Sequence, residues 1–491
     1  MTLSFEPLNQ RTMKTRKTKI IGTLGPSCKT EDTVAGLIEA GLDIARINLS
    51  HGDRQSHMSA IETVKRARER TDQRAAILLD TRGPEIRVGD LGNGIVLETD
   101  QTITFSKDPS IVDAIPVSYG GMPHDVSVGN SILLDDGKMR LRVAEIGATW
   151  VSARVIIGGM LKSRKRVSLP DIEVNLPSIT PEDRDDIIFG VEQEVDFIAA
   201  SFVRKAEDVE EIRRVIRQAG GDQWIIAKIE NRQGVDNLDE ILKTADGLMV
   251  ARGDLGVEMP AEMVPIIQKR IIRAANVAGK PVITATQMLE SMISSATPTR
   301  AEASDVTNAI FDGTDAVMLS GETAVGSYPL EAVQFLARNA RTSEEALDYE
   351  AILADGLRFR RRIITDAISY ASCATAADLS AAAIITATSS GSTALRVARY
   401  RPKAPILAFS SLPATLRKLQ LIRGVIPRSC THSNSLHQQI SFSTSQALEE
   451  GLIEIGDRVV ITAGLPLNTV GTTNTLKVLR IGGNDMEYSE E

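Results

Sequence analysis

Eight short runs rich in β-branched residues, each ending in polar residues, recur through the first 330 residues and constrain the fold most strongly. Most of them are followed by a stretch with helical periodicity, such as residues 34–40, 209–219 and 263–278. Apolar strands that alternate with helices indicate a parallel sheet covered on both faces. The eight runs span residues 19–24, 43–48, 75–80, 196–201, 224–230, 247–252, 281–286 and 316–320. They predict an α/β fold built on a closed (β/α)8 barrel, whose active site lies at the carboxyl ends of the strands.

The third βα unit is interrupted by a segment of a different pattern. Between about residues 88 and 169 the apolar residues alternate with a period of two, as in 95–98, 131–134 and 140–146. Turn signals such as Gly92-Asn93-Gly94 punctuate these strands. The segment predicts a small β-barrel domain inserted in a barrel loop, where it is placed to act as a lid.

A third unit follows from about residue 342. Helical sequence at 343–357 and 361–377 leads into strands that alternate with helices, which predicts an open α/β sheet. The predicted strands are residues 382–386, 405–409, 424–427 and 458–462, with a helix at 436–452. The predicted domains are an N-terminal arm (1–17), a discontinuous catalytic barrel (18–87 and 170–341), the lid (88–169) and a C-terminal α/β regulatory domain (342–491).

Charge and cysteine content exclude several classes of function. Acidic residues outnumber basic ones by 64 to 56, which argues against a nucleic-acid-binding surface. No apolar run approaches the ~20 residues that a membrane-spanning helix needs, so no membrane partner is expected. The three cysteines, Cys28, Cys373 and Cys430, are far apart and odd in number, which indicates a reducing compartment and a cytoplasmic protein.

The second and third predicted strands end in polar residues that could bind a phosphate or a cation. Arg46, Asn48 and Ser50 are two apart, so their side chains project to one side of a strand. An arginine with two neutral oxygen groups suits a phosphate and a weakly held cation, although a single arginine at a strand end often forms only a surface ion pair. Asp80 and Thr81 end the next strand and add oxygen ligands beside them.

Strands five to seven add a cation and two carboxylates. Lys228 and Glu230 point the same way at the barrel mouth, where a lysine needs a partner or an anionic ligand. Asp254, from the next strand, gives with Glu230 the sparse oxygen ligation that Mg²⁺ prefers when substrate completes its shell. Gly253 lets backbone N–H groups approach an anion, and Thr286 adds a hydroxyl. The plainer alternatives are a structural Lys–Glu pair and a helix cap by Asp254.

This inventory is what phosphoryl transfer needs, because catalysis there consists mostly of positioning and of neutralising negative charge. No Ser-His-Asp order, Walker sequence or kinase glycine-rich loop competes with it. Two alternatives explain less of the inventory. An Mg²⁺-dependent barrel aldolase acting through a pyruvate enolate would share the carboxylate pair, but it would not need Lys228, Arg46 and a monovalent-cation site together. A non-enzymatic sugar-phosphate sensor that uses the C-terminal domain is consistent only with a barrel that has lost its ligands, and none is lost.

Seven segments together resemble one family, the pyruvate kinases. They span the barrel in family order and include KIEN, MVARGDLGV and TATQMLESM, which is a specific combination. The segments are residues 18–27, 45–52, 79–87, 228–231, 249–257, 284–292 and 318–324. The resemblance implies transfer of the phosphoryl group of phosphoenolpyruvate to ADP, giving pyruvate and ATP. It also implies a homotetramer.

The resemblance also implies a role for each site residue. Arg46 and Lys228 would hold the transferring phosphoryl group, backbone N–H groups at Gly253 and Asp254 would seat the substrate carboxylate, and Thr286 would help protonate the enolate. The implied cofactors are Mg²⁺ (or Mn²⁺) and K⁺. The implied ligands are Glu230 and Asp254 for Mg²⁺, Asn48, Ser50, Asp80 and Thr81 for K⁺, and His51, Arg87 and Lys165 for the nucleotide phosphates. Glu85 is the residue that accompanies K⁺ dependence, Lys being the alternative, and Ser320 and Glu322 are candidates for the proton relay.

One loop of the C-terminal domain resembles the family's effector-phosphate loop. A strand runs into hydroxyl-bearing residues at the start of a helix, an arrangement that favours anions but also serves for ordinary capping. The candidate residues are Thr388, Ser389, Ser390, Gly391, Ser392 and Thr393. Ser389 stands where bisphosphate-activated members often carry Lys, and the later loop 465–474 contains no basic residue. A monophosphate effector, such as a sugar phosphate or AMP, is therefore expected rather than fructose 1,6-bisphosphate.

Overall fold

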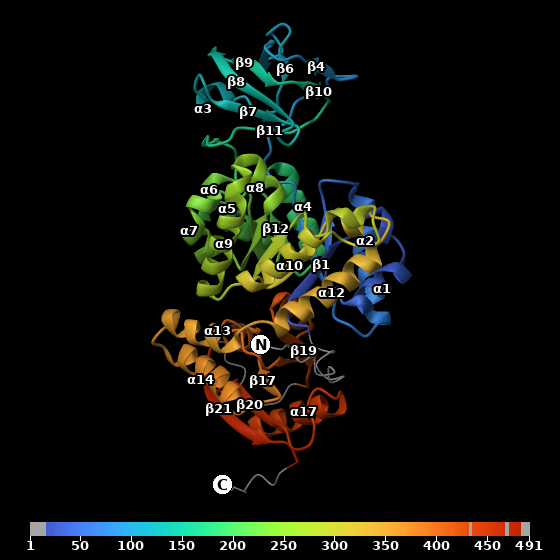
Figure 1. Cartoon of the computed structure of the whole chain (residues 1–491), viewed down its shortest axis with the longest axis vertical. Helices are drawn as coiled ribbons and strands as arrows, with labels where there is room; N and C mark the ends of the chain where they lie inside the picture. The colour runs from blue at the N-terminus through green and yellow to red at the C-terminus, as the bar shows by residue number, and fades with distance from the viewer. Residues whose placement is uncertain (1–15, 432–434, 467–470, 483–491) are drawn as a thin grey trace.

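The computed structural model describes residues 16–431, 435–466 and 471–482, and it confirms the predicted fold class. Figure 1 shows three units along one axis, with the barrel between the lid and the C-terminal domain. The barrel closes in the strand order β1-β16-β15-β14-β13-β12-β3-β2, and every pairing is parallel. Its strands are β1 (Lys19–Thr23), β2 (Ile44–Asn48), β3 (Ala76–Asp80), β12 (Phe197–Ala200), β13 (Trp224–Ile229), β14 (Gly247–Ala251), β15 (Val282–Ala285) and β16 (Ala316–Leu319).

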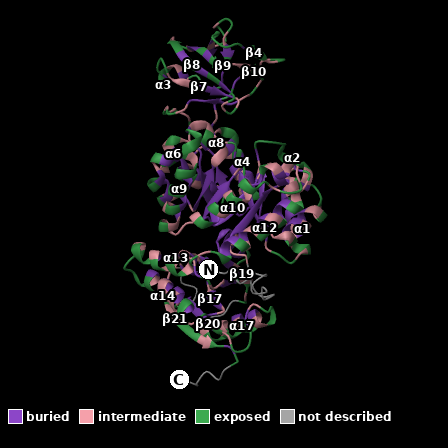
Figure 2. Cartoon of the chain, viewed as in Figure 1, coloured by how far each residue is buried: buried purple, intermediate pink, exposed green. Residues whose placement is uncertain are grey.

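The barrel strands are buried on both faces, which explains their continuous apolar sequence. One set of side chains, including Leu78, Phe197 and Met249, fills the interior, and a larger set packs between the strands and the helices outside. Figure 2 shows this core as a continuous buried region. The covering helices are α1 (Glu31–Ala40), α2 (Arg54–Arg70), α4 (Pro181–Glu192), α5 (Ala206–Gln218), α7 (Leu238–Thr244), α9 (Val264–Ala278), α10 (Arg300–Asp312) and α12 (Pro329–Glu345).

The lid is a six-stranded sheet of order β11-β7-β8-β9-β5-β6 with a separate β10-β4 pair. Two chain segments join it to the barrel and bond to each other, since Val167 N donates to Ile86 O and Val88 N to Lys165 O. The lid strands are β4 (Ile95–Leu97), β5 (Thr102–Ser106), β6 (Ile115–Pro116), β7 (Ser131–Leu134), β8 (Met139–Ile146), β9 (Trp150–Ile157), β10 (Gly159–Leu161) and β11 (Val167–Ser168). We call residues 84–88 and 164–169 the lid hinge.

The C-terminal unit is an open sheet of order β19-β18-β17-β20-β21. Its elements are α13 (Tyr349–Gly356), α14 (Ile364–Asp378), β17 (Ala383–Ala387), α15 (Ser392–Ala398), β18 (Ile406–Ser410), α16 (Pro413–Lys418), β19 (Val425–Ser429), α17 (Leu436–Glu449), β20 (Arg458–Gly464) and β21 (Thr473–Arg480). Two details differ from the sequence prediction. The single helix expected at 343–357 is broken, because Asp348 caps a new helix. The antiparallel edge strand β21 was not predicted.

Ion pairs and hydrogen bonds fasten the C-terminal unit to the base of the barrel. Arg417 on α16 pairs with Asp196 at 2.7 Å, just before β12. Lys19 at the start of β1 donates to the carbonyl of Val425 at 2.8 Å. In the part of the chain that the structure describes, no helix is both long and apolar enough to cross a membrane.

Candidate active site

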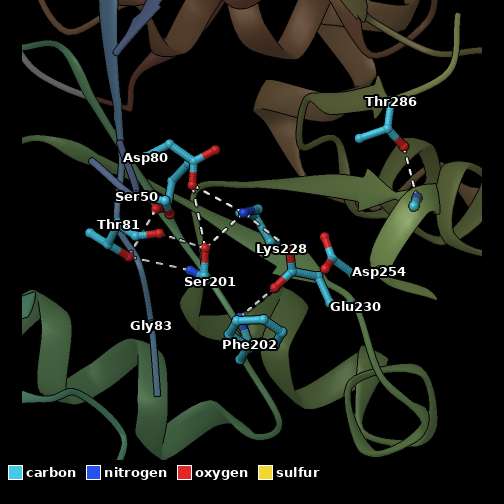
Figure 3. A network of polar contacts seen from close by, with 12 residues as sticks. Ser50, Asp80, Thr81, Gly83, Ser201, Phe202, Lys228, Glu230, Asp254 and Thr286 are labelled. Carbon is cyan, nitrogen blue, oxygen red and sulfur yellow. Dashed lines mark hydrogen bonds and ion pairs between the residues drawn. The ribbon is translucent and has the colours of Figure 1, made fainter. Parts of the chain in front are cut away.

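Lys228 lies at the centre of the polar groups at the barrel mouth (Figure 3). It is the residue before the last of β13, and its Nζ is 3.0 Å from Asp80 Oδ1, 3.0 Å from Glu230 Oε1 and 2.7 Å from Ser201 Oγ. The side chain is almost completely buried. The predicted approach of Lys228 and Glu230 therefore occurs, and Asp80 joins them from β3.

Arg46 reaches the same carboxylate from the opposite side. Its Nε donates to Asp80 Oδ2 at 2.7 Å, and a second guanidinium nitrogen donates to Thr23 Oγ1 at 2.9 Å. The register of β2 on β3 sets Asn48 beside Asp80. One buried carboxylate thus holds the two cations that a phosphoryl group would meet.

The buried charges shift one another's pKa values. Burial by itself would raise the pKa of the Asp80 carboxyl, but Lys228 and Arg46 hold it below its ordinary value. Burial would likewise lower the pKa of Lys228, yet Asp80 and Glu230 raise it. Burial and the nearby Asp254 carboxylate raise the pKa of Glu230 to about 7, against the opposing effect of Lys228. Lys228 therefore stays charged at neutral pH.

Glu230 and Asp254 lie next to each other at the ends of adjacent strands (Figure 3). Glu230 Oε2 accepts the backbone N–H of Phe202 at 2.6 Å, and the buried Oε1 lies 3.0 Å from Lys228 Nζ. No cluster of three or more His, Cys, Asp or Glu suited to a metal occurs within the described ranges. Two neighbouring carboxylates fit Mg²⁺, which takes few protein ligands and keeps several sites for substrate and water.

Asp254 has a partner that sequence reasoning missed. Arg166, in the lid hinge, places a guanidinium nitrogen 2.5 Å from Asp254 Oδ1 and another 3.2 Å from Glu258 Oε1. Its Cζ lies 4.6 Å from the centre of the Phe202 ring. Burial would lower the pKa of Arg166, but Asp254 and Glu258 raise it. Nothing in the local sequence marks this residue, because its reach depends on how the hinge folds onto α8 (Arg252–Glu258).

Thr286 and Gly253 meet as a pair. The backbone N–H of Gly253 donates to Thr286 Oγ1 at 2.8 Å. Thr286 and Gln287 both have positive φ, at 67° and 55°, a conformation that β-branched residues rarely adopt and that marks functional sites. Glu322 accepts the backbone N–H groups of Leu289 and Ser320, so its two oxygens are used in holding the neighbouring loops.

The candidate K⁺ ligands gather at the ends of β2 and β3. Asp80 and Thr81 are buried, and Ser50, though exposed, lies near them in Figure 3. Asn48 Oδ1 accepts the backbone N–H of Ser50 at 3.1 Å. Glu85 lies in the lid hinge, apart from these ligands. It pairs with Arg87, lies 3.9 Å from Arg166, and makes no contact with Asp80 among the described residues.

The candidate nucleotide contacts do not converge in this arrangement. His51 is exposed and its carbonyl accepts a hydrogen bond from His57. Lys165 pairs with Asp135 of the lid at 2.7 Å, and Arg87 pairs with Glu85. These cations belong to the barrel rim and the hinge, so their distances depend on the position of the lid.

The candidate effector loop lies between β17 and α15. Thr388 Oγ1 accepts the N–H of Gly391 at 2.9 Å, and Gly391 has a φ of 83°. Ser389 O accepts the hydroxyl of Thr415 on α16 at 2.8 Å. Thr393 contacts Thr473 at 3.0 Å, and residues 467–470 of the later loop lie outside the described residues.

Ser201 is a second residue that the sequence could have revealed. It directly follows β12, and its hydroxyl both accepts a hydrogen bond from Lys228 and donates one to Thr81 O at 2.7 Å. The predicted strand at 196–201 ends at this serine, so its hydroxyl is placed at the barrel mouth. The signal was its position at the carboxyl end of a barrel strand.

Comparisons with known proteins give one consistent result. The family model described as pyruvate kinase, barrel domain, matches residues 15–333, and that described as pyruvate kinase, alpha/beta domain, matches residues 366–479. The chain is 50% identical over 469 residues to a pyruvate kinase of Geobacillus stearothermophilus, covering 94% of this chain and 80% of the relative. It is 48% identical over 468 residues to a pyruvate kinase of Clostridium acetobutylicum, covering 94% and 99%. A solved pyruvate kinase from Cryptosporidium parvum superposes with a TM-score of 0.91 at 39% identity, covering 96% and 98%.

Proposed function

The chain belongs to the pyruvate kinase family, and from this premise we propose a role for each residue of its site. It is a phosphotransferase that moves the phosphoryl group of phosphoenolpyruvate to ADP, giving pyruvate and ATP. The observation that carries our assignment of roles is the buried set of Lys228, Arg46 and Asp80 at the barrel mouth. Two fixed cations on one carboxylate are arranged to receive a doubly charged phosphate.

Arg46 and Lys228 hold the phosphoryl oxygens and stay in place as the bond to the enol oxygen breaks. Because Asp80 fixes both side chains beforehand, no reorganisation is needed at the moment when negative charge spreads over the phosphoryl group. Lys228 then faces the enolate oxygen as well as the departing phosphoryl group. Its charge therefore stabilises the transition state more than the ground state.

Glu230 and Asp254 hold Mg²⁺ or Mn²⁺, and the metal, when bound, neutralises oxygen charge on the substrate. Backbone N–H groups at Gly253 and Asp254 begin α8 and seat the substrate carboxylate. Thr286, positioned by Gly253, delivers a proton toward the enolate carbon. Phosphoenolpyruvate, ADP, Mg²⁺ and K⁺ are the small molecules this site is built to take.

The lid supplies the nucleotide contacts and excludes water. Arg87 and Lys165 lie at the hinge, and His51 lies on the barrel rim, so movement of the lid brings them toward nucleotide phosphates. Closure removes water that would compete with ADP for the phosphoryl group. A coupled assay of pyruvate formation tests the reaction. Aldol cleavage without ATP formation from phosphoenolpyruvate would favour the aldolase alternative instead.

We propose that activity depends on K⁺, held by Asn48, Ser50, Asp80 and Thr81. We expect the wild-type rate in K⁺ to exceed the rate in tetramethylammonium by at least about tenfold, because a cation here stabilises developing phosphoryl charge. Replacing Glu85 with Lys should reduce this ratio, since it supplies a tethered positive charge in the hinge. Pyruvate formation is measured at constant ionic strength.

Glu173→Lys is the matched control for this change. Glu173 is exposed on the segment that follows the hinge. Its replacement by Lys therefore changes the charge by the same amount, but away from the proposed cation ligands. The control should keep the wild-type K⁺ ratio. Equal wild-type activity in both salts would contradict K⁺ dependence, and an unchanged ratio in Glu85→Lys would remove Glu85 from it.

We propose that a phosphorylated metabolite regulates the enzyme through the loop at 388–393. Thr415, which bonds to Ser389 O, lies on α16, and Arg417 of the same helix pairs with Asp196. Asp196 precedes β12, and Ser201 follows it with its hydroxyl on Lys228. These contacts connect the loop at 388–393 to Lys228, so a change in the loop can reach the catalytic lysine.

A monophosphate should activate, and a bisphosphate should not. With no basic residue in 465–474, a second phosphate lacks a partner. We expect millimolar sugar monophosphate or AMP to lower the phosphoenolpyruvate concentration at half saturation by about fivefold or more. Ser390→Asp should remove this shift by repelling the phosphate, whereas Ser380→Asp, exposed and outside the loop, should retain it. Activation by fructose 1,6-bisphosphate alone would contradict the proposal.

We further propose a homotetramer that works in the cytoplasm. Large apolar side chains are exposed on the outer barrel helices, with Ile266 61%, Phe311 49% and Leu330 38% exposed. Such side chains on neighbouring helices suit contacts with other copies of the chain. The three cysteines are free thiols, as a reducing compartment requires.

A further inference from the structure

Arg166 is a buried cation beside the site to which the reaction described above gives no task. Its side chain is 9% exposed, and its guanidinium contacts Asp254 and Glu258, which are four residues apart on α8. Its backbone belongs to the lid, because it pairs with Arg87 across the hinge and its carbonyl accepts the N–H of Asp135. One side chain thus fastens the moving domain to a proposed metal ligand.

The same guanidinium also contacts Phe202, the residue that hydrogen-bonds to Glu230. It lies over the ring of Phe202, whose backbone N–H donates to Glu230 Oε2 at 2.6 Å. Glu85 Oε1, on the other strand of the hinge, is 3.9 Å from Arg166 Nε. Arg166 therefore has contacts with the hinge, with α8 and with the loop behind Glu230.

A divalent cation and the guanidinium would both bind the Asp254 carboxylate. Arg166 donates to Asp254 Oδ1 at 2.5 Å, so a metal held by Asp254 would bring a second positive charge close to the guanidinium, and the two charges would repel. We propose that Arg166 is a positioning residue that competes with the metal for Asp254, so that metal binding releases the lid hinge from α8. This inference rests on the metal ligands proposed above.

Competition predicts two linked effects. Without the guanidinium the metal should bind more tightly, by about tenfold, the effect of removing one competing charge-assisted hydrogen bond. In the wild-type protein the metal should loosen the hinge, because a contact between lid and barrel is lost when Asp254 turns to the metal. By linkage, whatever opens this contact must also tighten metal binding.

The test uses Mn²⁺ binding and amide hydrogen exchange on the full chain. Free Mn²⁺ is counted by electron paramagnetic resonance, and exchange is followed for residues 164–169. We expect Arg166→Gln to bind Mn²⁺ about tenfold more tightly, with hinge exchange already raised and no further rise on adding Mn²⁺. In the wild-type protein, Mn²⁺ should raise hinge exchange.

Arg164→Gln is the matched control. It removes the same charge from an exposed side chain that lies two residues before Arg166. It should leave Mn²⁺ affinity unchanged. Arg166→Lys keeps the charge but loses the two-pronged guanidinium, so its Mn²⁺ affinity should lie between wild type and Arg166→Gln; it also serves if the Gln variant does not fold.

The outcomes distinguish failure of the proposed competition from failure of the proposed metal site. Glu230→Gln should bind Mn²⁺ weakly, and wild-type affinity in that variant would overturn the metal ligands and the inference together. If Glu230→Gln is weakened while Arg166→Gln binds Mn²⁺ like the wild type or like Arg164→Gln, the metal site stands and the competition is wrong. Unchanged hinge exchange in the wild type with Mn²⁺ would also overturn it.

Discussion

Replacing Lys228 with Met should lower kcat by about 10²–10³ while the protein stays folded, because one transition-state charge contact is worth ~3–4 kcal/mol. The ammonium group is nearly buried and held by Asp80, Glu230 and Ser201, so the charge acts at short range in a water-poor site. The loss should fall on kcat more than on the KM for ADP, because the proposed nucleotide contacts lie elsewhere, on the barrel rim and in the lid hinge. The measurement is the coupled assay of pyruvate formation.

Ser201→Ala separates the charge of Lys228 from its position. This change removes one hydrogen bond to Nζ but leaves the ammonium group between its two carboxylates. We expect less than about a tenfold loss of kcat. Far-ultraviolet circular dichroism of both variants checks that the fold is retained. A Lys228→Met enzyme that keeps more than about a tenth of the wild-type kcat would remove Lys228 from this role.

The barrel and its central residues were predictable because their signals are local. Strands buried on both faces must be apolar throughout, and the carboxyl ends of parallel strands meet at one edge. The meeting of Lys228 with Glu230 follows from spacing alone. The edge strand β21 lacks such a signal, since most of its residues are at least partly exposed and polar residues interrupt it.

The residues that sequence reasoning missed depend on contacts across domains. Arg166 follows a lid strand in the chain, yet it touches α8 of the barrel, about 90 residues further along. Glu85 is only five positions beyond Asp80 in the chain, yet the chain turns into the hinge there and Glu85 pairs with Arg87. Spacing along one strand predicts direction, whereas a hinge redirects side chains in a way that only the tertiary fold decides.

Replacing Asp80 with Asn should destabilise the barrel by about 3–5 kcal/mol, the typical result of removing one partner from a buried ion pair. Asp80 is 1% exposed and holds both Arg46 and Lys228. Without its charge, Arg46 keeps a neutral partner, Thr23 Oγ1, while Lys228 keeps Glu230. We expect K⁺ activation to be lost as well, because Asp80 is the charged member of the proposed K⁺ ligands.

The pH dependence of the stability lost in Asp80→Asn tests whether this loss is electrostatic in origin. The pKa of Asp80 is held below its ordinary value of 3.8, so its stabilising effect is complete above about pH 4 and is lost as pH falls through the lower folded pKa. The difference between Asp80→Asn and wild type, measured by urea unfolding, should therefore be constant near neutrality and shrink in acid. Asp53→Asn makes the same chemical change at an exposed helix cap, where Asn serves equally well, and should cost little. If Asp80→Asn lost no more free energy of unfolding than this control, Arg46 and Lys228 would not need the Asp80 carboxylate in order to stay buried.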